Sequence, residues 1–503
     1  MSDYWLLAVT TVIVLGTSLL LRTKSQPPPA YIGDREDITA LVRAGAIEKK
    51  AIWEVFDGLA KKYGDIFSFE LGGKPVVVLS SAQMATNLLD KRGEIYSSRP
   101  RLIMAHEILS GNLRGLSAPY GEYWRKWRKI QHTGMSGRAS LAYREHQTLE
   151  STVLLRDLAR DPSNYSSLVE MFAVSVVLSI SYGRRASSLE EEVVKVNAEA
   201  ISEFQRVITS GKHVVETWPS LLWLPRPLQW FRQDADKKHA ADTRFYLRLL
   251  RDVRRRMYAG TAKECMSSRS LAAPSSNVSE VEVAYSVAAP FGAGVHTTSG
   301  SIEYAILAMI LYPETAHRVQ VELDAVVGRE RFPGFEDESS LPYLHSFILE
   351  LSRWRPPVPL AVPHAVTRDD YFLGGRIAKG TTVYGNIYTM MQDTVMFPDP
   401  EEFRPERFMD GALSDFTLPF GFGRRQCPGM HVASQSLFIV IGRLLWAFDV
   451  VSLAAPDPHS YVNHGLVRGP GKISFELRFR DNDAMRLVEA EAAEAEERLK
   501  EWA

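Results

Sequence analysis

The sequence predicts a single, mainly α-helical fold with a small β region. Most of its apolar segments repeat with helical spacing, and the longest runs from about residue 281 to 311, where Pro313 ends it because proline cannot continue a helix. Residues 66–79 instead alternate apolar and polar side chains around a Gly-Gly pair, which is typical of a β-hairpin. No internal repeat and no long low-complexity linker divides the 503 residues.

The composition excludes several classes of protein. Lys and Arg (59) nearly balance Asp and Glu (60), so no overall field favours a nucleic-acid partner. Two cysteines, Cys265 and Cys427, are too few for a disulfide framework or a four-thiolate metal site. A mean hydropathy of -0.13 excludes a polytopic membrane protein. A globular protein of a reducing compartment remains, with room for one membrane anchor.

The N-terminal segment is typical of such an anchor. Residues 4–21 form an uncharged apolar run of 18 residues, at the short end of the roughly 17–25 that span a bilayer. Arg22 and Lys24 follow this run, which places the rest of the chain in the cytosol by the positive-inside rule. A cleaved signal peptide is the alternative, but its leading segment is basic and Asp3 makes this one acidic. We expect an N-terminal membrane anchor (1–24), a proline-rich hinge (25–34), a catalytic domain (35–483) and an acidic helical tail (484–503), which we expect to be solvated.

A second segment also bears on the membrane. Residues 218–231, WPSLLWLPRPLQWF, hold three tryptophans, three prolines and four leucines, which is unfavourable for a regular helix. One interpretation is a loop packed on the core. The other is a surface that dips into the membrane, since tryptophan favours the interface.

The strongest chemical signal is the decapeptide FGFGRRQCPG at residues 420–429. A glycine-rich loop leads to Cys427, and Pro428 suits the first position of a helix that begins right after it. A cysteine at a helix N-terminus is stabilised as a thiolate by the helix dipole and the free N–H groups. A buried cysteine in an ordinary turn is the simpler alternative.

The neighbours of Cys427 favour a ligand. Gly423 and Gly429 allow a flat, bulky group to approach the backbone, and Arg425 offers a guanidinium to carboxylates. A thiolate bound to a haem iron, with an arginine on the haem propionates, fits all of these features.

This decapeptide resembles the haem-binding signature of the cytochrome P450 family, Phe-x-x-Gly-x-Arg-x-Cys-x-Gly, at every fixed position from Phe420 onward. The resemblance covers nearly the whole chain and implies the cytochrome P450 fold, haem b as cofactor and Cys427 as the protein ligand of its iron. Glu350 and Arg353 match the family's Glu-x-x-Arg, and residues 403–408 match its Phe-x-Pro-x-Arg-Phe. The resemblance implies that these two residues and Arg407 form a buried structural charge network.

A third motif, Trp-x-x-x-Arg, is matched by Trp124 and Arg128, which share one face of a predicted helix. The resemblance implies that both reach the haem propionates, together with His364. Arg125 and Lys129 share a different face, which we expect to remain in solvent. In the family this face docks an acidic electron-donor protein.

The predicted oxygen-binding turn departs from the family's pattern. Residues 293–298 match Ala/Gly-Gly-x-Asp/Glu-Thr-Thr/Ser except that His296 replaces the acid before Thr297. The Thr297 hydroxyl still holds a water, but the carboxylate that usually feeds protons is missing. Three alternatives follow: His296 relays protons, with a dependence between about pH 6 and 8; protons take another route; or the chemistry differs from ordinary hydroxylation.

Electrons must come from another protein. The sequence has no dinucleotide-binding Gly-x-Gly-x-x-Gly motif and no P-loop, so it shows no site of its own for NADPH or flavin. By resemblance, NADPH acts only indirectly, through NADPH–cytochrome P450 reductase, with cytochrome b5 as a second candidate donor.

The predicted function is that of a haem-thiolate monooxygenase, which inserts one oxygen atom from dioxygen into a lipophilic small molecule. The flanks of the signature resemble microsomal fungal members that act on secondary-metabolite intermediates, which implies a single-pass protein of the endoplasmic reticulum with a cytosolic catalytic domain. One alternative is an isomerase or dehydratase on the same haem scaffold that does not use dioxygen. The other is a non-catalytic haem-binding partner subunit.

Overall fold

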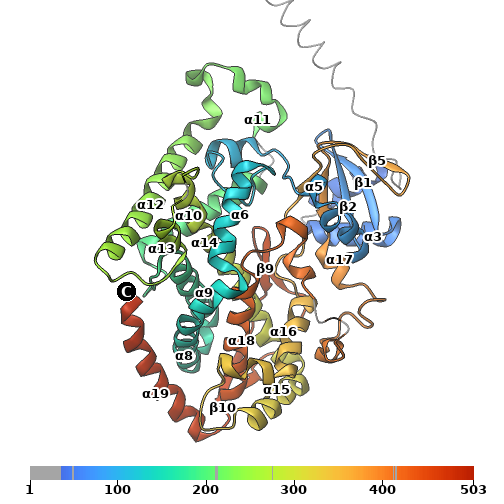
Figure 1. Cartoon of the computed structure of the whole chain (residues 1–503). Helices are drawn as coiled ribbons and strands as arrows, with labels where there is room; N and C mark the ends of the chain where they lie inside the picture. The colour runs from blue at the N-terminus through green and yellow to red at the C-terminus, as the bar shows by residue number, and fades with distance from the viewer. Residues whose placement is uncertain are drawn as a thin grey trace, which may run out of the picture.

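The computed structural model describes residues 35–47, 50–209, 213–274, 276–411, 413 and 416–502. The expected anchor (1–24) and hinge (25–34) therefore lie outside the described residues. Figure 1 shows a large helical body beside a smaller lobe that carries the main sheet.

Long helices make up most of the fold, as the apolar spacing predicts. They are α2 (Arg35–Ile47), α3 (Ile52–Tyr63), α6 (Glu122–Met135), α8 (Arg144–Arg160), α9 (Tyr165–Tyr182), α10 (Glu192–Thr209), α12 (Gln233–Tyr258), α14 (Glu280–Leu311), α15 (Pro313–Val326), α16 (Pro342–Trp354), α18 (Met430–Ala447) and α19 (Asn482–Leu499). Short helices α4 (Ala82–Ala85), α5 (Gly93–Tyr96), α7 (Gly137–Ser140), α11 (Val214–Thr217), α13 (Met266–Ala272) and α17 (Ile387–Met391) connect them.

The central helix α14 forms over the predicted stretch. Its start is fixed by Ser279, whose hydroxyl accepts the N–H of Glu282 while the Glu282 carboxylate accepts the N–H of Ser279. Its end lies just before Pro313, as expected from the missing N–H of proline. The largest apolar cluster of the described chain packs α8, α9, α12, α16 and α18 around this helix.

The sheet of the smaller lobe joins distant parts of the chain. The predicted hairpin is β1 (Ile66–Leu71) and β2 (Lys74–Leu79), and β2 pairs in parallel with β6 (Thr382–Gly385). Strand β3 (His364–Ala365) completes the sheet on the far side of β6. The remaining described strands form three two-stranded ladders: β4 (Asp370–Phe372) with β5 (Gly375–Ile377), β7 (Phe448–Ser452) with β10 (Phe475–Phe479), and β8 (Tyr461–His464) with β9 (Val467–Pro470).

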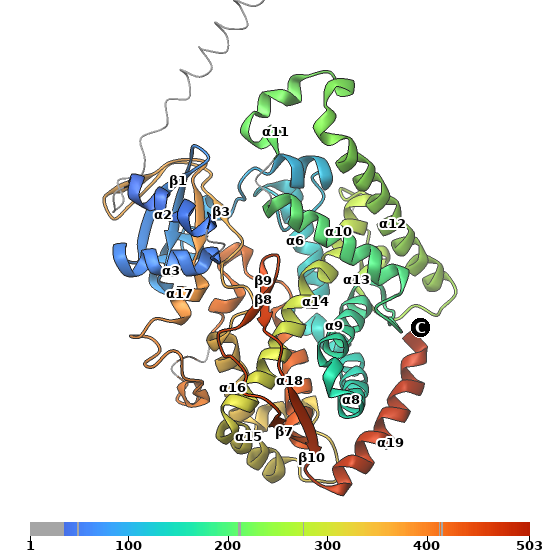
Figure 2. The same cartoon turned by 180° about the vertical axis from the view of Figure 1, so that it is seen from behind.

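The acidic tail is helical but not fully solvated. Helix α19 runs along the outside of α8, and both views place the chain end beside α13 (Figures 1 and 2). Leu499 and Trp502 are buried against Leu149 and Val153 of α8. The outer face alone meets water, because apolar side chains every three or four residues turn the inner face onto the body.

The tryptophan-rich segment lies at one tip of the molecule, next to α11 (Figure 2). It forms short turns rather than a regular helix, as its prolines predict. Trp218, Trp223 and Trp230 are 60%, 80% and 61% exposed, so these three side chains are not packed on the core.

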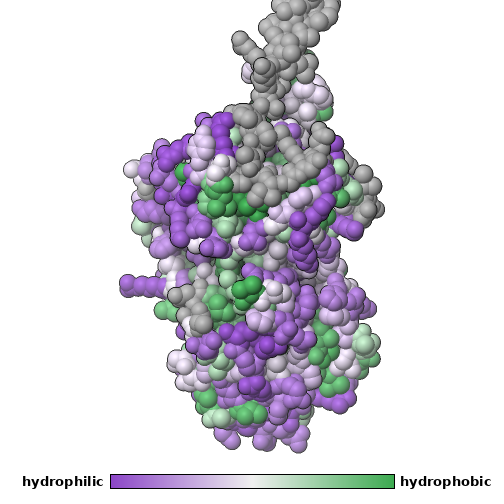
Figure 3. Space-filling model, turned by 90° about the vertical axis from the view of Figure 1, so that its right-hand side faces the viewer, coloured by the Kyte–Doolittle hydropathy of each residue, from purple (hydrophilic) through white to green (hydrophobic). Residues whose placement is uncertain are grey.

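Among the described residues, two helical stretches, Pro162–Tyr182 and Met430–Ala447, are long and apolar enough to span a membrane. Both are mostly buried inside the body, which is how core helices of a globular protein behave. One face of the surface, shown in Figure 3, carries hydrophobic patches separated by hydrophilic residues.

Candidate active site

Cys427 lies in a tight loop that fixes its backbone. Its N–H donates to the Phe420 carbonyl oxygen at 2.9 Å and closes the loop across the glycine-rich stretch. Gly423 has a φ of +50°, and a Cβ at this position would lie 2.3 Å from the Leu89 carbonyl oxygen. Only glycine therefore fits there without moving the neighbouring chain.

The helix after the loop begins later than the sequence predicts. Helix α18 starts at Met430 with Gly429 as its N-cap residue, so Pro428 lies outside the helix. The Gly429 N–H, at the start of this helix, donates a hydrogen bond to the Cys427 sulfur. The N–H stabilisation of a thiolate is thus retained, although the predicted helical position of Pro428 is wrong.

The two cysteines have different surroundings. Cys265 is buried, whereas the Cys427 side chain is exposed on one side. Loss of hydration among the surrounding residues raises the pKa of the Cys427 thiol. The Gly429 N–H and the Arg128 guanidinium act in the opposite direction. Cys427 is open to a ligand, and a metal ion that binds the sulfur would displace its proton.

Basic side chains from four segments gather at this loop: Arg99, Arg128, His364 and, from the loop itself, Arg425. Arg128, on α6, donates to the Gln426 carbonyl oxygen at 2.7 Å. Arg425 donates to the carbonyl oxygens of Ser97 and Ala118, each at 2.7 Å. These bonds hold the guanidinium groups in place without neutralising them.

Trp124 is one turn from Arg128 on α6, as the predicted shared face requires. The guanidinium carbon of Arg425 lies 4.4 Å from the centre of a Trp124 ring, within the range of a cation–π contact. The buried indole N–H of Trp124 has no hydrogen-bond partner among the described residues. This donor is therefore available to an acceptor atom of a ligand.

The clustered cations destabilise one another. Burial, with repulsion from Arg99 and Arg128, lowers the pKa of Arg425 to about 8. Burial lowers the pKa of Arg99 to about 9, and burial and then Arg99 lower the pKa of His364 well below its usual range. In the described chain these four groups bond backbone carbonyl oxygens, and no carboxylate forms an ion pair with them. A dianionic ligand would relieve the repulsion.

Arg99 is the member of this cluster that the sequence analysis misses. Its guanidinium donates to Leu116 O at 3.1 Å and to Pro363 O at 2.9 Å, which places it directly beside His364. The only local signal is Pro100, which favours an extended backbone at the preceding residue. The role of Arg99 becomes visible once the fold brings residues 99 and 364 together.

The structure also brings together the three residues predicted to form a charge network. Glu350 accepts from Arg353 at 2.7 and 2.8 Å and from Arg407 at 3.4 Å. Arg353 also donates to backbone carbonyl oxygens, including that of Pro400 at 2.6 Å. Every charge in this network is paired, so it differs from the cation cluster in needing no ligand.

The predicted oxygen-binding turn lies inside α14, which is continuous through Pro290. The Thr297 hydroxyl donates to the Ala293 carbonyl oxygen at 2.6 Å, which leaves its lone pairs free to accept. The His296 ring stacks on that of His464, with 4.8 Å between ring centres. Sequence reasoning does not anticipate this contact.

Comparison with known proteins identifies the scaffold. The family model for cytochrome P450 matches residues 38–477. Cytochrome P450 monooxygenase 58 of Postia placenta is 34% identical over 460 residues and covers 87% of each chain. The chain belongs to the cytochrome P450 family. Cytochrome P450 monooxygenase aneD of Aspergillus aculeatus is 31% identical over 98% of this cytochrome P450 and 95% of its own length.

Solved structures share the fold. Two zebrafish cytochrome P450 structures, described with abiraterone and with progesterone, align with TM-scores of 0.67 and 0.70. Each covers 86% of this chain and 100% of its own, at 24% and 22% identity, so the likeness concerns the fold alone. The predicted mainly helical cytochrome P450 fold with a small β region is confirmed. The relatives are named monooxygenases, which identifies this cytochrome P450 as a monooxygenase, an oxidoreductase.

Membership of this family implies haem as the cofactor, and the residues present fit it. Haem offers an iron that binds a thiolate and two propionates that bind cations and N–H donors. The site around Cys427 offers the complementary set: an open thiol, unpaired cations and the free indole N–H of Trp124.

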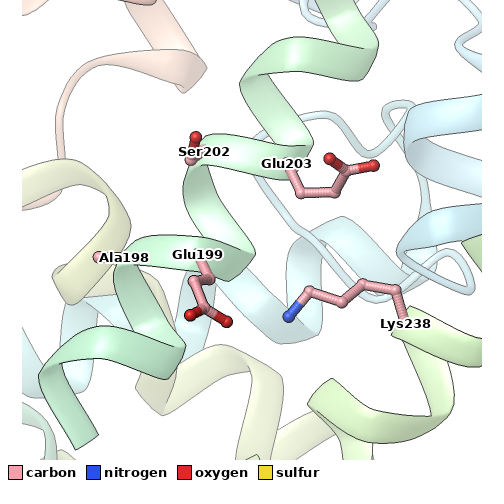
Figure 4. A pocket seen from close by; sticks show the side chains of 5 residues that line it. All are labelled: Ala198, Glu199, Ser202, Glu203 and Lys238. Atoms are coloured by element: carbon pink, nitrogen blue, oxygen red, sulfur yellow. The ribbon is translucent and has the colours of Figure 1, made fainter. Parts of the chain in front are cut away.

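A separate hollow of about 590 Å³ lies between α10 and α12. Figure 4 shows Glu199 and Glu203 of α10 around the ammonium of Lys238 on α12. This charged lining is unsuited to a lipophilic molecule, and Lys238 is already paired with Asp242 at 2.7 Å. The hollow is therefore not part of the site around Cys427.

Proposed function

We propose that Cys427 ligates the haem iron and that the cation cluster binds the two haem propionates. The observation that carries this proposal is a set of buried positive groups without a carboxylate partner, beside an exposed thiol. Arg128 and Arg425 are placed to bind carboxylates. The other residues assigned to the cofactor site are Trp124, His364, Phe420, Gly423 and Gly429.

His364 takes part only after it gains a proton. Its Nδ1 lies 2.7 Å from the Tyr96 carbonyl oxygen. A carbonyl oxygen only accepts, so Nδ1 carries the hydrogen and Nε2 of the neutral ring has none to donate. A propionate beside His364 favours the protonated ring, and we propose that haem binding raises the pKa of this residue.

Thr297 and His296 serve the oxygen-binding side. When bound, haem supplies the activation of dioxygen, whose two oxygen atoms end in the substrate and in water. Thr297 accepts a hydrogen bond from water in the α14 turn, because its own proton is given to Ala293. His296 stands in place of the usual acid and passes protons toward Thr297.

The proposed substrate is a lipophilic small molecule, such as a secondary-metabolite intermediate. The segment before α6 and the end of α10 form an apolar cluster that includes Ile103, Met104, Ile108 and Phe204. Ala293 is exposed on α14 one turn before Thr297, whereas Ile201 fills the space where a Cβ of Gly292 would lie. Apolar walls of this kind suit a ligand that binds through burial of apolar surface rather than through ionic contacts.

The proposed electron donor is NADPH–cytochrome P450 reductase, with cytochrome b5 as a second candidate. Arg125 and Lys129 are exposed on α6, on a face away from buried Trp124. Exposed Arg424 adds a further positive charge from the Cys427 loop. This basic surface complements an acidic partner and lies close to the proposed cofactor site.

We propose that the protein sits on the endoplasmic reticulum membrane as a single-pass protein with its catalytic domain in the cytosol. The apolar run at residues 4–21 supplies the span, and the three exposed tryptophans of residues 218–231 supply a second contact with the interface. Deletion of residues 1–22 should weaken membrane association without loss of haem. N-linked glycan at Asn164 or Asn277 would contradict this topology.

The carbon-monoxide spectrum of the reduced protein tests the cofactor site. We expect the long-wavelength Soret band of a thiolate-ligated haem, and Cys427→Ala should abolish it. Cys265→Ala is the matched control and should leave the band unchanged. A band that persists in Cys427→Ala would refute the assignment. NADPH consumption in the presence of the reductase then tests the electron supply.

A further inference from the structure

A pair of histidine rings connects the α14 turn with the surface. His296 is half-buried on α14, one residue before Thr297, and His464 is exposed at the end of β8. The two rings are parallel to within 11°, with 4.8 Å between their centres. The pair therefore reaches from the interior turn to solvent.

One acidic side chain interacts with His464, and a second one interacts with the first. Burial raises the pKa of half-buried Glu170 of α9, and the electrostatic interaction of this carboxyl with His464 opposes part of that shift. Buried Glu303 of α14 faces Glu170 and accepts from the Ser166 hydroxyl at 2.7 Å. Burial also raises the pKa of Glu303. When it is ionised, Glu170 attracts positive charge toward this end of the pair.

The hairpin that carries His464 is fixed in position. Gln205 of α10, a neutral side chain, donates to the His464 carbonyl oxygen at 3.4 Å. Gly465 has a φ of +67°, and a Cβ there would lie 2.5 Å from the Gln205 carboxamide. Arg468 of β9 donates to Pro356 O at 3.2 Å and is engaged away from the pair. These contacts fix the hairpin so that the His464 ring stays against the His296 ring.

We infer that His464 is the outer member of a proton path that runs through His296 to Thr297. This inference rests on the proposed function, in which the α14 turn receives protons. Monooxygenation of a C–H bond converts substrate, dioxygen, two protons and two electrons into an alcohol and water. The electrons come from a reductase, and both protons enter from solvent. Within the pair, His464 is the more exposed ring.

The stacked geometry sets how the pair works. Parallel rings do not donate N–H groups to each other, so water at the ring edges completes each transfer. A proton on one ring repels a proton on the other, so protonation of both rings together is disfavoured. Burial, and next His464, lower the pKa of His296. His296 therefore gives up its proton readily, and His464 reloads it.

The test compares His464→Gln with the matched control His459→Gln, an exposed histidine of the same region. Full-length, haem-loaded protein labelled at histidine is titrated by NMR in the diamagnetic carbon-monoxide form. We expect the pKa of His296 to rise in His464→Gln and to stay unchanged in His459→Gln. In turnover with the reductase, the product-to-peroxide ratio should fall at least about threefold in His464→Gln, a small part of the roughly hundredfold that a positioned proton donor contributes.

The outcomes separate this inference from the proposed function. If His464→Gln matches His459→Gln in both the His296 titration and the product-to-peroxide ratio, the proton path is overturned while monooxygenation stands. If the ratio falls but the pKa of His296 does not move, the two rings are not coupled and the path through His296 is overturned. A parent protein that shows the thiolate Soret band yet forms no oxygenated product with the reductase would overturn the proposed function itself.

Discussion

Replacing Glu350 by glutamine removes one charge from the buried network and keeps its shape. Glu350 and Arg353 are both 0% exposed, and Glu350 also accepts the Arg404 backbone N–H at 2.7 Å. The substitution leaves the Arg353 guanidinium buried without a counter-charge, which costs about 3–5 kcal/mol. We expect the free energy of unfolding of the haem-loaded protein to fall by this amount, as measured by urea unfolding followed by far-UV circular dichroism.

The chain offers a matched control for this experiment. Glu203 and Arg206 on α10 have the same three-residue spacing and pair at 2.6 Å, but their side chains are 31% and 62% exposed. Water screens this pair, so Glu203→Gln should cost less than about 1 kcal/mol. A loss in Glu350→Gln no greater than in Glu203→Gln would refute the argument that burial makes this network essential.

Four further predictions test other parts of the structure. Arg425→Leu removes charge-assisted bonds to the proposed propionates, so haem transfer to apomyoglobin should be roughly tenfold faster or more. Thr297→Ala should raise the share of NADPH that ends as hydrogen peroxide at unchanged haem content. Trp502→Ala should lower the free energy of unfolding by about 2–4 kcal/mol, because it empties the contact between the chain end and α8. Burial lowers the pKa of His106 to about 4. Below the ordinary pKa of 6.5 the unfolded chain therefore binds more protons than the folded chain, and the free energy of unfolding falls as pH decreases. His106→Gln should remove about 2 kcal/mol of this decrease in the free energy of unfolding between pH 7 and pH 5.

The parts of the fold that were predictable have local causes. The helix over 281–311 and the hairpin over 66–79 follow from periodicity, from Pro313 and from the Gly-Gly turn, all of which act within a few residues. The pairing of β2 with β6 joins segments about 300 residues apart, and no local pattern specifies it. The start of α18 was misplaced because proline is acceptable both inside and just before a first turn.

The same distinction applies to the site. Cys427, Arg425 and Glu350 belong to contiguous motifs that the sequence displays. Arg99 and His464 act through neighbours that the fold supplies, His364 in one case and His296 in the other. No pattern within either segment reveals those neighbours. Residues of this second kind can be identified only from the folded structure.

The structure also moves the expected pH window of His296. The sequence alone places its titration between about pH 6 and 8, around the ordinary imidazole pKa. Burial and then His464 lower this pKa, so the ring stays neutral at pH 7 and gains a proton only at lower pH. Any coupling that depends on a protonated His296 should therefore strengthen as pH falls below 6.5.

The two buried charge clusters of this protein differ in whether their charges are paired within the chain. A cluster with internal pairs has a structural role, and a cluster without them is suited to bind a ligand. The Glu350 network contains both signs of charge, and its hydrogen bonds are complete within the chain. The cluster around Cys427 contains positive groups alone, and it lowers the pKa of Arg425 to about 8. Burying these cations without a counter-charge is unfavourable, because each one loses its hydration and gains no ion pair. An anion that binds to the cluster offsets this cost. In the proposed site the haem propionates would supply that anion, and the free energy that the cluster costs the cofactor-free chain would become affinity for haem.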